Sequence, residues 1–402
     1  MNKIKNYIGQ FHMIVWVLLI GTVLSRGSAF MTLPFLSIYL SNHMELPPLI
    51  IGLIVGMGPL SATVGGFIGG HLSDRFGRKP IMLISLLAFV GVYFGFTLAH
   101  SQGWFILLNA LNGLCNSFFE PTAQALMGDV TDKKNRMKAY SLRYTAINIG
   151  ASVGPLVGAY LAVSSANISF MITGTTYFIY AIILFFFMRK LVLPKREKNH
   201  KPVTILDSLQ IIKTDKALRY LVLGIIIINL GYVQLDSNIP QFLQGRLDNG
   251  VYIFSVLLTI NAVMVVFLQM PISHLVEKFK PMRVMIAGSV LMAAGLLGFG
   301  FVNGWVISIF SVVLITLGEI LIFPSNSILI DQLAPDHLRG TYFGAGQFRK
   351  IGNFFGPIIG GYLLGHTNGA SMFTVIMAIT LSSILFFLIG NRYYLKISLQ
   401  RG

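Results

Sequence analysis

Long apolar runs separated by short polar segments dominate this chain. The runs lie near residues 13–40, 49–71, 80–99, 104–127, 139–163, 168–190, 219–243, 251–274, 282–302, 304–328, 340–366 and 370–390. A membrane-spanning helix needs roughly 20 predominantly apolar residues, and every run reaches that length. The pattern therefore predicts twelve membrane-spanning α-helices joined mostly by short loops.

Composition supports an all-α integral membrane protein. Hydrophobic residues make up 54% of the 402 residues and charged residues only 11%, whereas soluble domains carry about 25% charge. The first run, from Met13 to Leu40, is too long for a signal-peptide core and has no small-residue cleavage pattern, so we expect a retained helix. Little chain is left over for a soluble enzyme module.

The distribution of positive charge predicts which side of the membrane each loop occupies. The net charge is +16, but Lys and Arg collect in alternate connections such as "DKKNRMK" and "EKFKPMR". The intervening connections "SNHMELPP", "AHSQG", "VSSANIS", "VNG" and "GHTNGA" contain neither. By the positive-inside rule, both termini are cytoplasmic and the protein is a multi-pass protein of the cell membrane. This placement indicates membrane lipids rather than nucleic acid as the partner of the basic residues.

An internal repeat divides the chain into two halves. Three pairs of positions recur at a separation of 203 or 202 residues: His71 with His274, Pro121 with Pro324, and Gly150 with Gly352. We expect an N-terminal six-helix bundle in residues 1–190, a cytoplasmic linker in 191–218 and a C-terminal six-helix bundle in 219–402. Six helices return the chain to the same side, so the copies are parallel and a pathway is expected between them.

The linker contains one segment with helical spacing, "VTILDSLQIIKTDKAL". This segment either lies on the inner membrane surface, where basic residues attract anionic lipid, or is a solvated connection.

Glycine runs in the fifth and eleventh predicted helices form a second repeated feature. "GASVGPLVGA" places Gly150, Gly154 and Gly158 on one helix face, where another helix can approach closely. Pro155 and Pro357 each remove a backbone hydrogen bond and favour a bend. The second copy supplies Gly352, Gly356 and Gly360. Ordinary small-residue packing is the alternative, but the repetition favours bendable helices at the interface between the halves.

Two motifs resemble those of a known family. "GHLSDRFGRKPIM" is similar to the signature loop of the major facilitator superfamily, and the glycine run resembles the motif typical of its drug and proton antiporters. The segment "FFEPTAQAL", with an acid before proline, resembles bacterial multidrug efflux transporters. The resemblance implies two six-helix bundles around a central cavity, rocking between inward-open and outward-open states. We expect a bacterial protein that functions as a monomer.

The signature loop implies a cytoplasmic latch. Its members would be Gly70, Asp74, Arg75, Gly77, Arg78 and Lys79, together with Asp129. By the resemblance, Asp74 meets the amino end of the eleventh helix and Arg78 pairs with Asp129. The second copy has Glu277 in place of the aspartate, so its latch should be weaker. A basic loop that only sets topology is the alternative.

Few charges lie inside the apolar runs. A charge near the bilayer centre costs about 2.5–3.5 kcal/mol on insertion scales, so each one suggests a function. Our proton-coupling candidates are Glu120, Asp236, Glu319 and Arg26. The alternative for each acid is an ion pair with Arg26 or Arg143 that holds helices together. The family's proton-linked exporters usually have an arginine in the fourth helix, where this chain has Asn109, so that role does not transfer.

Aromatic and basic residues on the inner helices suggest a substrate cavity. Its candidates are Phe30, Tyr144, Tyr232, Arg143 and Arg349. Arg349 and Lys350 either attract an anionic substrate group or serve in packing. The histidines form no spacing typical of a metal site, and we expect no catalytic residue, no metal and no cofactor.

The function favoured by these features is secondary active transport: proton-coupled export of amphiphilic drugs or related small molecules, with the proton gradient as energy source. One alternative is export of a dedicated metabolite such as a metallophore, and another is a nutrient importer or facilitator of the same fold. A membrane enzyme is disfavoured, because the sequence has no His-Glu-x-x-His, no Gly-Lys phosphate loop and no Cys-x-x-Cys.

Overall fold

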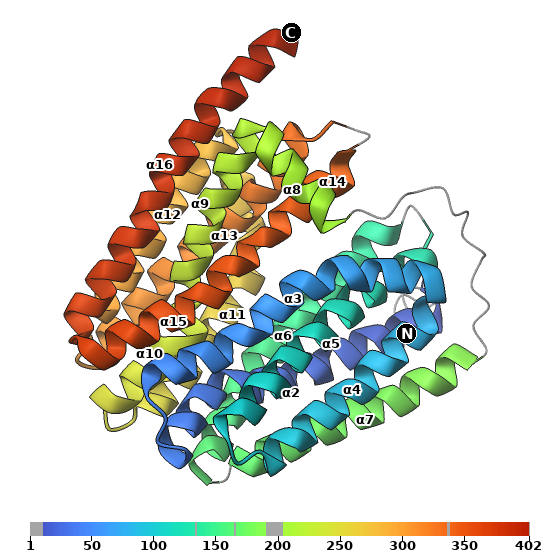
Figure 1. The fold of residues 1–402 in the computed structure, drawn as a ribbon, viewed down its shortest axis with the longest axis vertical. Helices are drawn as coiled ribbons and strands as arrows, with labels where there is room; N and C mark the ends of the chain where they lie inside the picture. Colours follow the sequence, from blue (N-terminus) through green and yellow to red (C-terminus); the bar gives the residue numbers. More distant parts are fainter. Residues whose placement is uncertain (1–10, 133–134, 165, 190–203, 336–337, 402) are drawn as a thin grey trace.

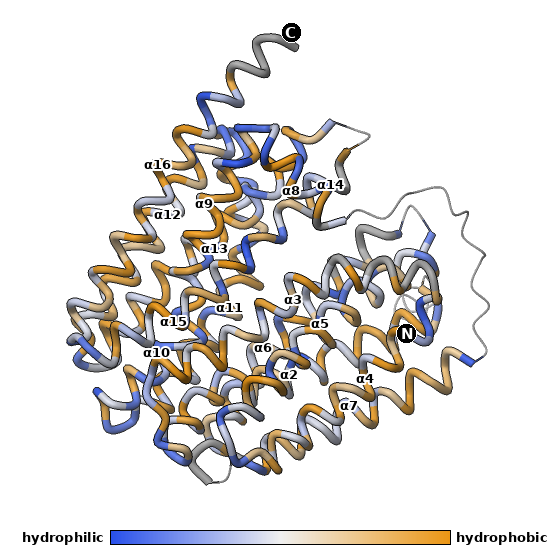
Figure 2. The backbone as a smooth tube through the Cα atoms, viewed as in Figure 1, coloured by the Kyte–Doolittle hydropathy of each residue, from blue (hydrophilic) through white to orange (hydrophobic). Residues whose placement is uncertain are grey.

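A computed structural model describes residues 11–132, 135–164, 166–189, 204–335 and 338–401 of the chain, although a few side chains inside these ranges are outside the description. Within these ranges the protein consists of helices, turns and bends, with no β-strand. Nine helices there are long and apolar enough to cross a membrane by length and composition. Figure 2 shows hydrophobic residues along the helices and hydrophilic residues concentrated toward their ends. The expected all-α membrane fold is confirmed.

Six helices form the N-terminal bundle (Figure 1). They are α2 (Met13–His43), α3 (Pro48–Phe76), α4 (Arg78–Leu98), α5 (Gln102–Asp129), α6 (Arg136–Ser164) and α7 (Ala166–Arg189). Their buried apolar side chains make one cluster that runs along the sequence from Phe11 to Met188. The aromatic rings of Phe89, Tyr93 and Tyr177 stack inside it. The N-terminal bundle thus has an apolar core of its own.

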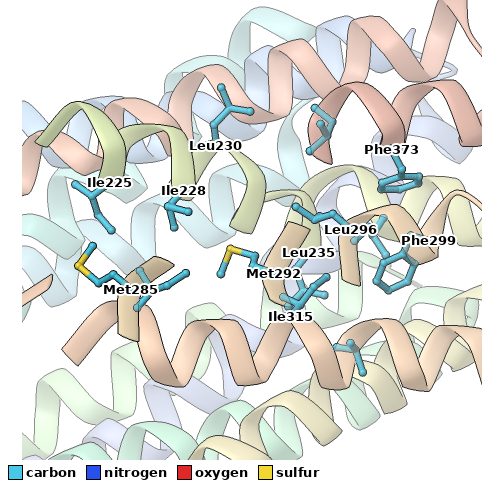
Figure 3. Close-up of a cluster of buried hydrophobic side chains, with 14 of the residues drawn as sticks. Ile225, Ile228, Leu230, Leu235, Met285, Met292, Leu296, Phe299, Ile315 and Phe373 are labelled. Carbon is cyan, nitrogen blue, oxygen red and sulfur yellow. The ribbon is translucent and has the colours of Figure 1, made fainter. Parts of the chain in front are cut away.

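The second bundle contains six membrane-crossing units. They are α9 (Lys216–Tyr232) with α10 (Gln234–Arg246), then α11 (Gly250–Val276), α12 (Pro281–Phe299) and α13 (Trp305–Leu333), then α14 (Arg339–Gly346) with the 3-10 turn η3 (Gln347–Arg349) and α15 (Lys350–His366), and finally α16 (Gly369–Arg401). Their core includes Met285, Met292, Phe299 and Phe373 (Figure 3). With α9 and α10 counted as one crossing, and α14 to α15 as another, the described ranges contain the twelve predicted helices.

The seventh and eleventh crossings differ from the single helices expected. The seventh is interrupted at Val233, between α9 and α10, and the eleventh tightens into η3 before α15 begins at Lys350. Polar residues lie at both interruptions, Gln234 after the first and Gln347 in the second, but a polar residue within a span does not by itself indicate a change in backbone hydrogen bonding. The interruptions place Asp236 in the first turn of α10 and Lys350 at the first position of α15.

The signature loop is more helical than expected. α3 continues to Phe76, and α4 begins at Arg78, so one residue separates the two helices. That residue, Gly77, has φ +91°, a backbone conformation that side chains with a Cβ rarely adopt. The tight turn therefore depends on Gly77 alone. The last helix, α16, also extends through most of the polar tail that follows the predicted span.

The glycine faces of α6 and α15 pack inside each bundle, while other sides of the same helices contact the other bundle, α6 at α11 and α15 at α3. A Cβ on Gly150 would lie 2.7 Å from the backbone nitrogen of Gly27 in α2, and one on Gly154 would collide with the carbonyl oxygen of Gly27. In the second copy, Gly352 and Gly356 press in the same way against α9. Missing side chains let helix backbones approach closely, and here the close neighbour is the first helix of the same bundle.

The two bundles meet mainly toward one end of the molecule. There α3 contacts α15 so closely that a Cβ on Gly52 or Gly361 would collide with the carbonyl oxygen of Pro357 or Pro48. The side-chain amide of Gln244 also donates a 2.7 Å hydrogen bond to Asn42 Oδ1 across the boundary. This end carries the connections that are poor in Lys and Arg. Toward the other end, where α8 and α14 lie, the two bundles diverge (Figure 1).

A short helix, α8 (Ile205–Thr214), follows the linker. It begins with a capping box between Thr204 and Asp207. Ser208 Oγ donates to the carbonyl oxygen of Thr341 at 3.5 Å, and the hydroxyl of Tyr342 donates to Asp215 Oδ2 at 2.7 Å. The helical part of the linker is therefore attached to α14.

Candidate functional site

Glu120 joins three helices of the N-terminal bundle. Its carboxylate, on α5, lies 2.7 Å from Nη2 of Arg26 on α2 and forms a second ion pair with Arg143 on α6. The side chains are only 25%, 21% and 10% exposed for Arg26, Glu120 and Arg143. The structure thus brings together three of the predicted charges. Two arginines around one carboxylate leave a net positive charge and stabilise the ionised form of Glu120.

Two acids of the second bundle have a different environment. Glu319 on α13 accepts a 2.7 Å hydrogen bond from the side-chain amide of Asn261 on α11, which also donates to Thr316 Oγ1 at 3.0 Å. Asp236, on α10, belongs to the same bundle. Among the described residues, neither acid forms an ion pair. Both carboxyl groups can therefore gain or lose a proton without breaking one.

Two neighbouring cations lie at the junction of η3 and α15. The guanidinium of Arg349 is 5.9 Å from the centre of the Phe323 ring, over its face. Lys350 extends toward the other bundle, where its Nζ donates to the carbonyl oxygen of Ala62 on α3 at 3.4 Å. The two cations therefore have different surroundings, although they are adjacent in sequence.

A cavity of about 320 Å³ lies between the bundles. Its apolar part comes mostly from α2 and α3, and its polar part includes four asparagines and three charged residues. The lining residues are Arg26, Ala29, Phe30, Leu33, Pro34, Leu36, Val55, Gly58, Pro59, Ala62, Asn109, Asn112, Gly113, Asn116, Val233, Asp236, Lys350 and Asn353. A pocket with a large apolar surface and a few polar groups is typical of small-molecule sites.

The predicted cavity residues agree with this lining only in part. Of the five candidates, Phe30 is in the lining, whereas Tyr144, Tyr232, Arg143 and Arg349 are not. A role in substrate binding for these four residues stays a prediction. The candidates Arg26 and Asp236 line the cavity directly, and Glu120 reaches it through Arg26.

Of the four asparagines in the lining, only Asn109 was noted from the sequence, because a single amide in an apolar helix is common and has no distinctive spacing. Asn109 shows what such a residue does here. Its amide nitrogen donates to the carbonyl oxygens of Ile54 at 2.7 Å and Val55 at 3.1 Å. Pro59 lacks the N–H that would bond to the carbonyl of Val55 within α3, so Asn109 replaces the missing donor. The structure thus gives Asn109 a role in stabilising α3.

The described part of the latch contains one of the expected contacts. Arg78 Nε lies 3.4 Å from Asp129 Oδ2, and the arginine side chain is only 9% exposed. Gly70 and the side chains of Asp74 and Arg75 fall outside the described residues, so the contact between Asp74 and the eleventh helix stays a prediction, as does the role of Lys79.

The second copy of the latch is more open. Glu277 and His274 are each 80% exposed and 3.8 Å apart. The weaker second latch that we expect from the sequence stays a prediction.

A metal site has no support in the structure: where side chains are described, no three His, Cys, Asp or Glu residues group as metal ligands. The single cysteine, Cys115, is buried as a free thiol.

Comparison with known proteins agrees with this geometry. The sequence profile described as Major Facilitator Superfamily matches residues 18–350. An uncharacterized MFS-type transporter of Bacillus subtilis, YqjV, is 33% identical over 391 residues, which is 95% of each chain. The Na(+), Li(+), K(+)/H(+) antiporter of Planococcus maritimus is 26% identical over 85% of this chain and 87% of its own. Multidrug resistance protein MdtG of Dickeya zeae is 28% identical over 93% of this chain and 92% of its own.

Solved structures share the fold. A POT family transporter in complex with 5-aminolevulinic acid superposes with a TM-score of 0.82 at 12% identity, over 94% of this chain and 96% of its own. That similarity concerns the arrangement of helices alone, while the profile match and the 33% identity concern the sequence itself. The chain therefore belongs to the major facilitator superfamily of membrane transporters.

Proposed function

We propose that this transporter exports amphiphilic small molecules in exchange for protons, by alternating access of the central cavity. One observation carries the proposal: a largely apolar cavity between the bundles is lined by Asp236, a carboxyl group without an ion-pair partner in the described chain. An amphiphile can bury its apolar part there. A proton and a cationic substrate group can compete for the same carboxylate, and such competition couples the two movements.

Asp236 and Glu319 are the proposed proton carriers. Both are partly buried, and neither has an ion-pair partner among the described residues, so each can change its protonation state without breaking an ion pair. Glu120 is less suited, because protonating it would leave Arg26 and Arg143 beside each other without a counter-charge. We therefore assign Glu120 a structural role, in ion pairs that hold the helices of its bundle together.

The arrangement of the bundles fits a state that loads substrate from the cytoplasm. The positive-inside rule assigns the end with α8 and α14 to the cytoplasm, and the bundles diverge toward that end. The contacts of Gly52 and Gly361 join them toward the opposite end. Export as the direction of transport is further supported by the relative named a multidrug resistance protein, and proton exchange by the relative named a cation/H(+) antiporter.

The test is dye transport in proteoliposomes containing the purified protein. With an acidic lumen, molecules inserted with their cytoplasmic face outward should accumulate Hoechst 33342, and a protonophore should abolish the accumulation. Asp236→Asn and Glu319→Gln should each remove the effect of the pH gradient. Glu277→Gln is the matched control, because it makes the same kind of change at a carboxylate that is 80% exposed.

Two results would contradict the proposal. Dye accumulation that is equal with and without the pH gradient would exclude proton coupling. Gradient-driven accumulation that persists in both carboxyl variants would exclude Asp236 and Glu319 as the carriers.

A further inference from the structure

Two opposite charges line the cavity without pairing with each other. Asp236 enters the lining from the first turn of α10, and Lys350 enters it from the start of α15. Neither forms an ion pair with any residue that the structure describes. The hydrogen bond found for Lys350 Nζ is the 3.4 Å contact with the carbonyl oxygen of Ala62. Because a buried charge is unfavourable without a partner, both groups favour a ligand that brings the opposite charge.

The third charge in the lining already has a counter-ion, which it shares with Arg143. Arg26 lies 2.7 Å from the carboxylate of Glu120. An anionic ligand group would therefore have to compete with Glu120 for Arg26, whereas it would meet no competing carboxylate at Lys350. Arg349, the neighbouring cation, packs over Phe323 and is absent from the lining. Lys350 is thus the cation available to a ligand.

The remaining lining residues provide both apolar surface and uncharged polar side chains. Phe30, Leu33 and Pro34 of α2 provide an apolar wall. The amides of Asn112, Asn116 and Asn353 provide hydrogen-bonding groups, and Oδ1 of Asn353 is buried without a hydrogen-bond partner. These surfaces suit a molecule with a compact apolar body and more than one polar group.

We propose that the cavity binds zwitterionic amphiphiles, with the ligand's ammonium group at Asp236 and its carboxylate at Lys350. The inference rests on the proposed function and specifies its substrate class. The ammonium group is the part that competes with a proton for Asp236. The carboxylate contributes affinity through Lys350 and leaves that competition unchanged, so exchange for protons is retained.

Three probes that share a biphenyl group test the contributions of the two charges separately. Biphenylalanine carries both charges, its decarboxylated analogue 2-(biphenyl-4-yl)ethylamine carries only the ammonium group, and 3-(biphenyl-4-yl)propionate carries only the carboxylate. Binding to the purified full-length protein in detergent is measured by equilibrium dialysis, with no pH gradient. We expect biphenylalanine to bind about tenfold more tightly than either analogue, the lower range for a hydrogen bond to a charged group.

Two variants test which residue binds each charged group of the ligand. In Lys350→Gln, the amino acid and the amine should bind with equal Kd, and in Asp236→Asn the amino acid and the propionate should do so. Lys213→Gln makes the same change at an exposed lysine of α8 outside the cavity lining, and this control should retain the tenfold preference. The readout is a ratio of two Kd values in the same protein. A substitution that only shifts the balance between conformations changes both values equally and leaves the ratio unchanged.

Equal Kd values for the three probes would overturn the inference, as would undetectable binding of biphenylalanine or a ratio that Lys350→Gln does not alter. These results are distinguishable from failure of the proposed function. Gradient-driven transport of Hoechst 33342 combined with equal Kd values would reject the zwitterionic substrate class and retain the exporter. A tenfold preference for biphenylalanine without gradient-driven transport of Hoechst 33342 would retain the zwitterionic ligand class and reject the proton-coupled exporter.

Discussion

Removing the negative charge of Glu120 should destabilise the N-terminal bundle more than any other single loss of a buried charge. The substitution Glu120→Gln leaves Arg26 and Arg143 on two adjacent helices without their shared counter-charge. At 2.7 Å, the Arg26 pair alone corresponds to about 6 kcal/mol of Coulomb attraction at an effective dielectric constant of about 20. Desolvation offsets much of this, and breaking one buried pair typically costs about 3–5 kcal/mol. Since Glu120 is 21% exposed, we expect the lower value, about 3 kcal/mol.

The single cysteine provides the assay. Cys115 lies on α5, the same helix as Glu120, and is 6% exposed. A maleimide should label it only when the bundle opens. When opening is fast compared with labelling, a loss of about 3 kcal/mol increases the open population, and so the labelling rate, about 100-fold.

Two further variants control for other effects. Glu319→Gln neutralises a partly buried acid of the other bundle, and it should leave the labelling rate of Cys115 near that of the parent protein. Combining Glu120→Gln with Arg143→Gln should recover part of the stability, because one uncompensated cation is removed. A Glu120→Gln protein that is labelled at the parent rate would refute the claim that the ion pairs hold this bundle together.

Three other predictions concern contacts between segments. Gly52→Val should prevent close contact of α3 with α15, abolish transport, and increase labelling of a cysteine introduced at Phe30 from the outer side; unchanged labelling would contradict this. Asn109→Leu should lower the thermal unfolding midpoint, because two carbonyl groups of α3 lose their side-chain donor. The expected loss in the free energy of unfolding is about 1–3 kcal/mol. Tyr342→Phe removes the hydrogen bond to Asp215, so amide exchange in α8 should accelerate about tenfold; equal exchange rates would show that packing alone holds α8.

The apolar pattern predicted the helices well because lipid imposes a simple requirement. Each crossing must supply about 20 apolar residues and satisfy its own backbone hydrogen bonds, so a span such as α4 is evident without knowledge of its neighbours. The same pattern did not reveal the interruptions at Val233 and Gln347, because the polar residues at these places can occur in a continuous helix as well as in an interrupted one. Hydropathy does not report local backbone hydrogen bonding.

The partners of a side chain depend on the rotation of its helix about the helix axis and on the depth of the helix in the membrane. The sequence of a helix that is apolar on most sides gives little information about its rotation or its depth. The sequence therefore suggested Arg26 or Arg143 as partners for any of three acids, and only the tertiary structure assigned both arginines to Glu120. It likewise separated Lys350, which lines the cavity, from the adjacent Arg349, which packs over Phe323. The glycine runs identified helices that approach a neighbour closely, but not which neighbour.

The sequence by itself determined the family, the helical membrane fold and the identity of the charges inside the apolar runs, because length, hydropathy and motif spacing are properties of the chain. Its duplication into two parallel halves was likewise an inference from spacing. The tertiary structure decided which charges neutralise one another and which line the cavity unpaired. That outcome depends on distances of a few ångströms between helices far apart in sequence, and electrostatic attraction and desolvation both change steeply over such distances.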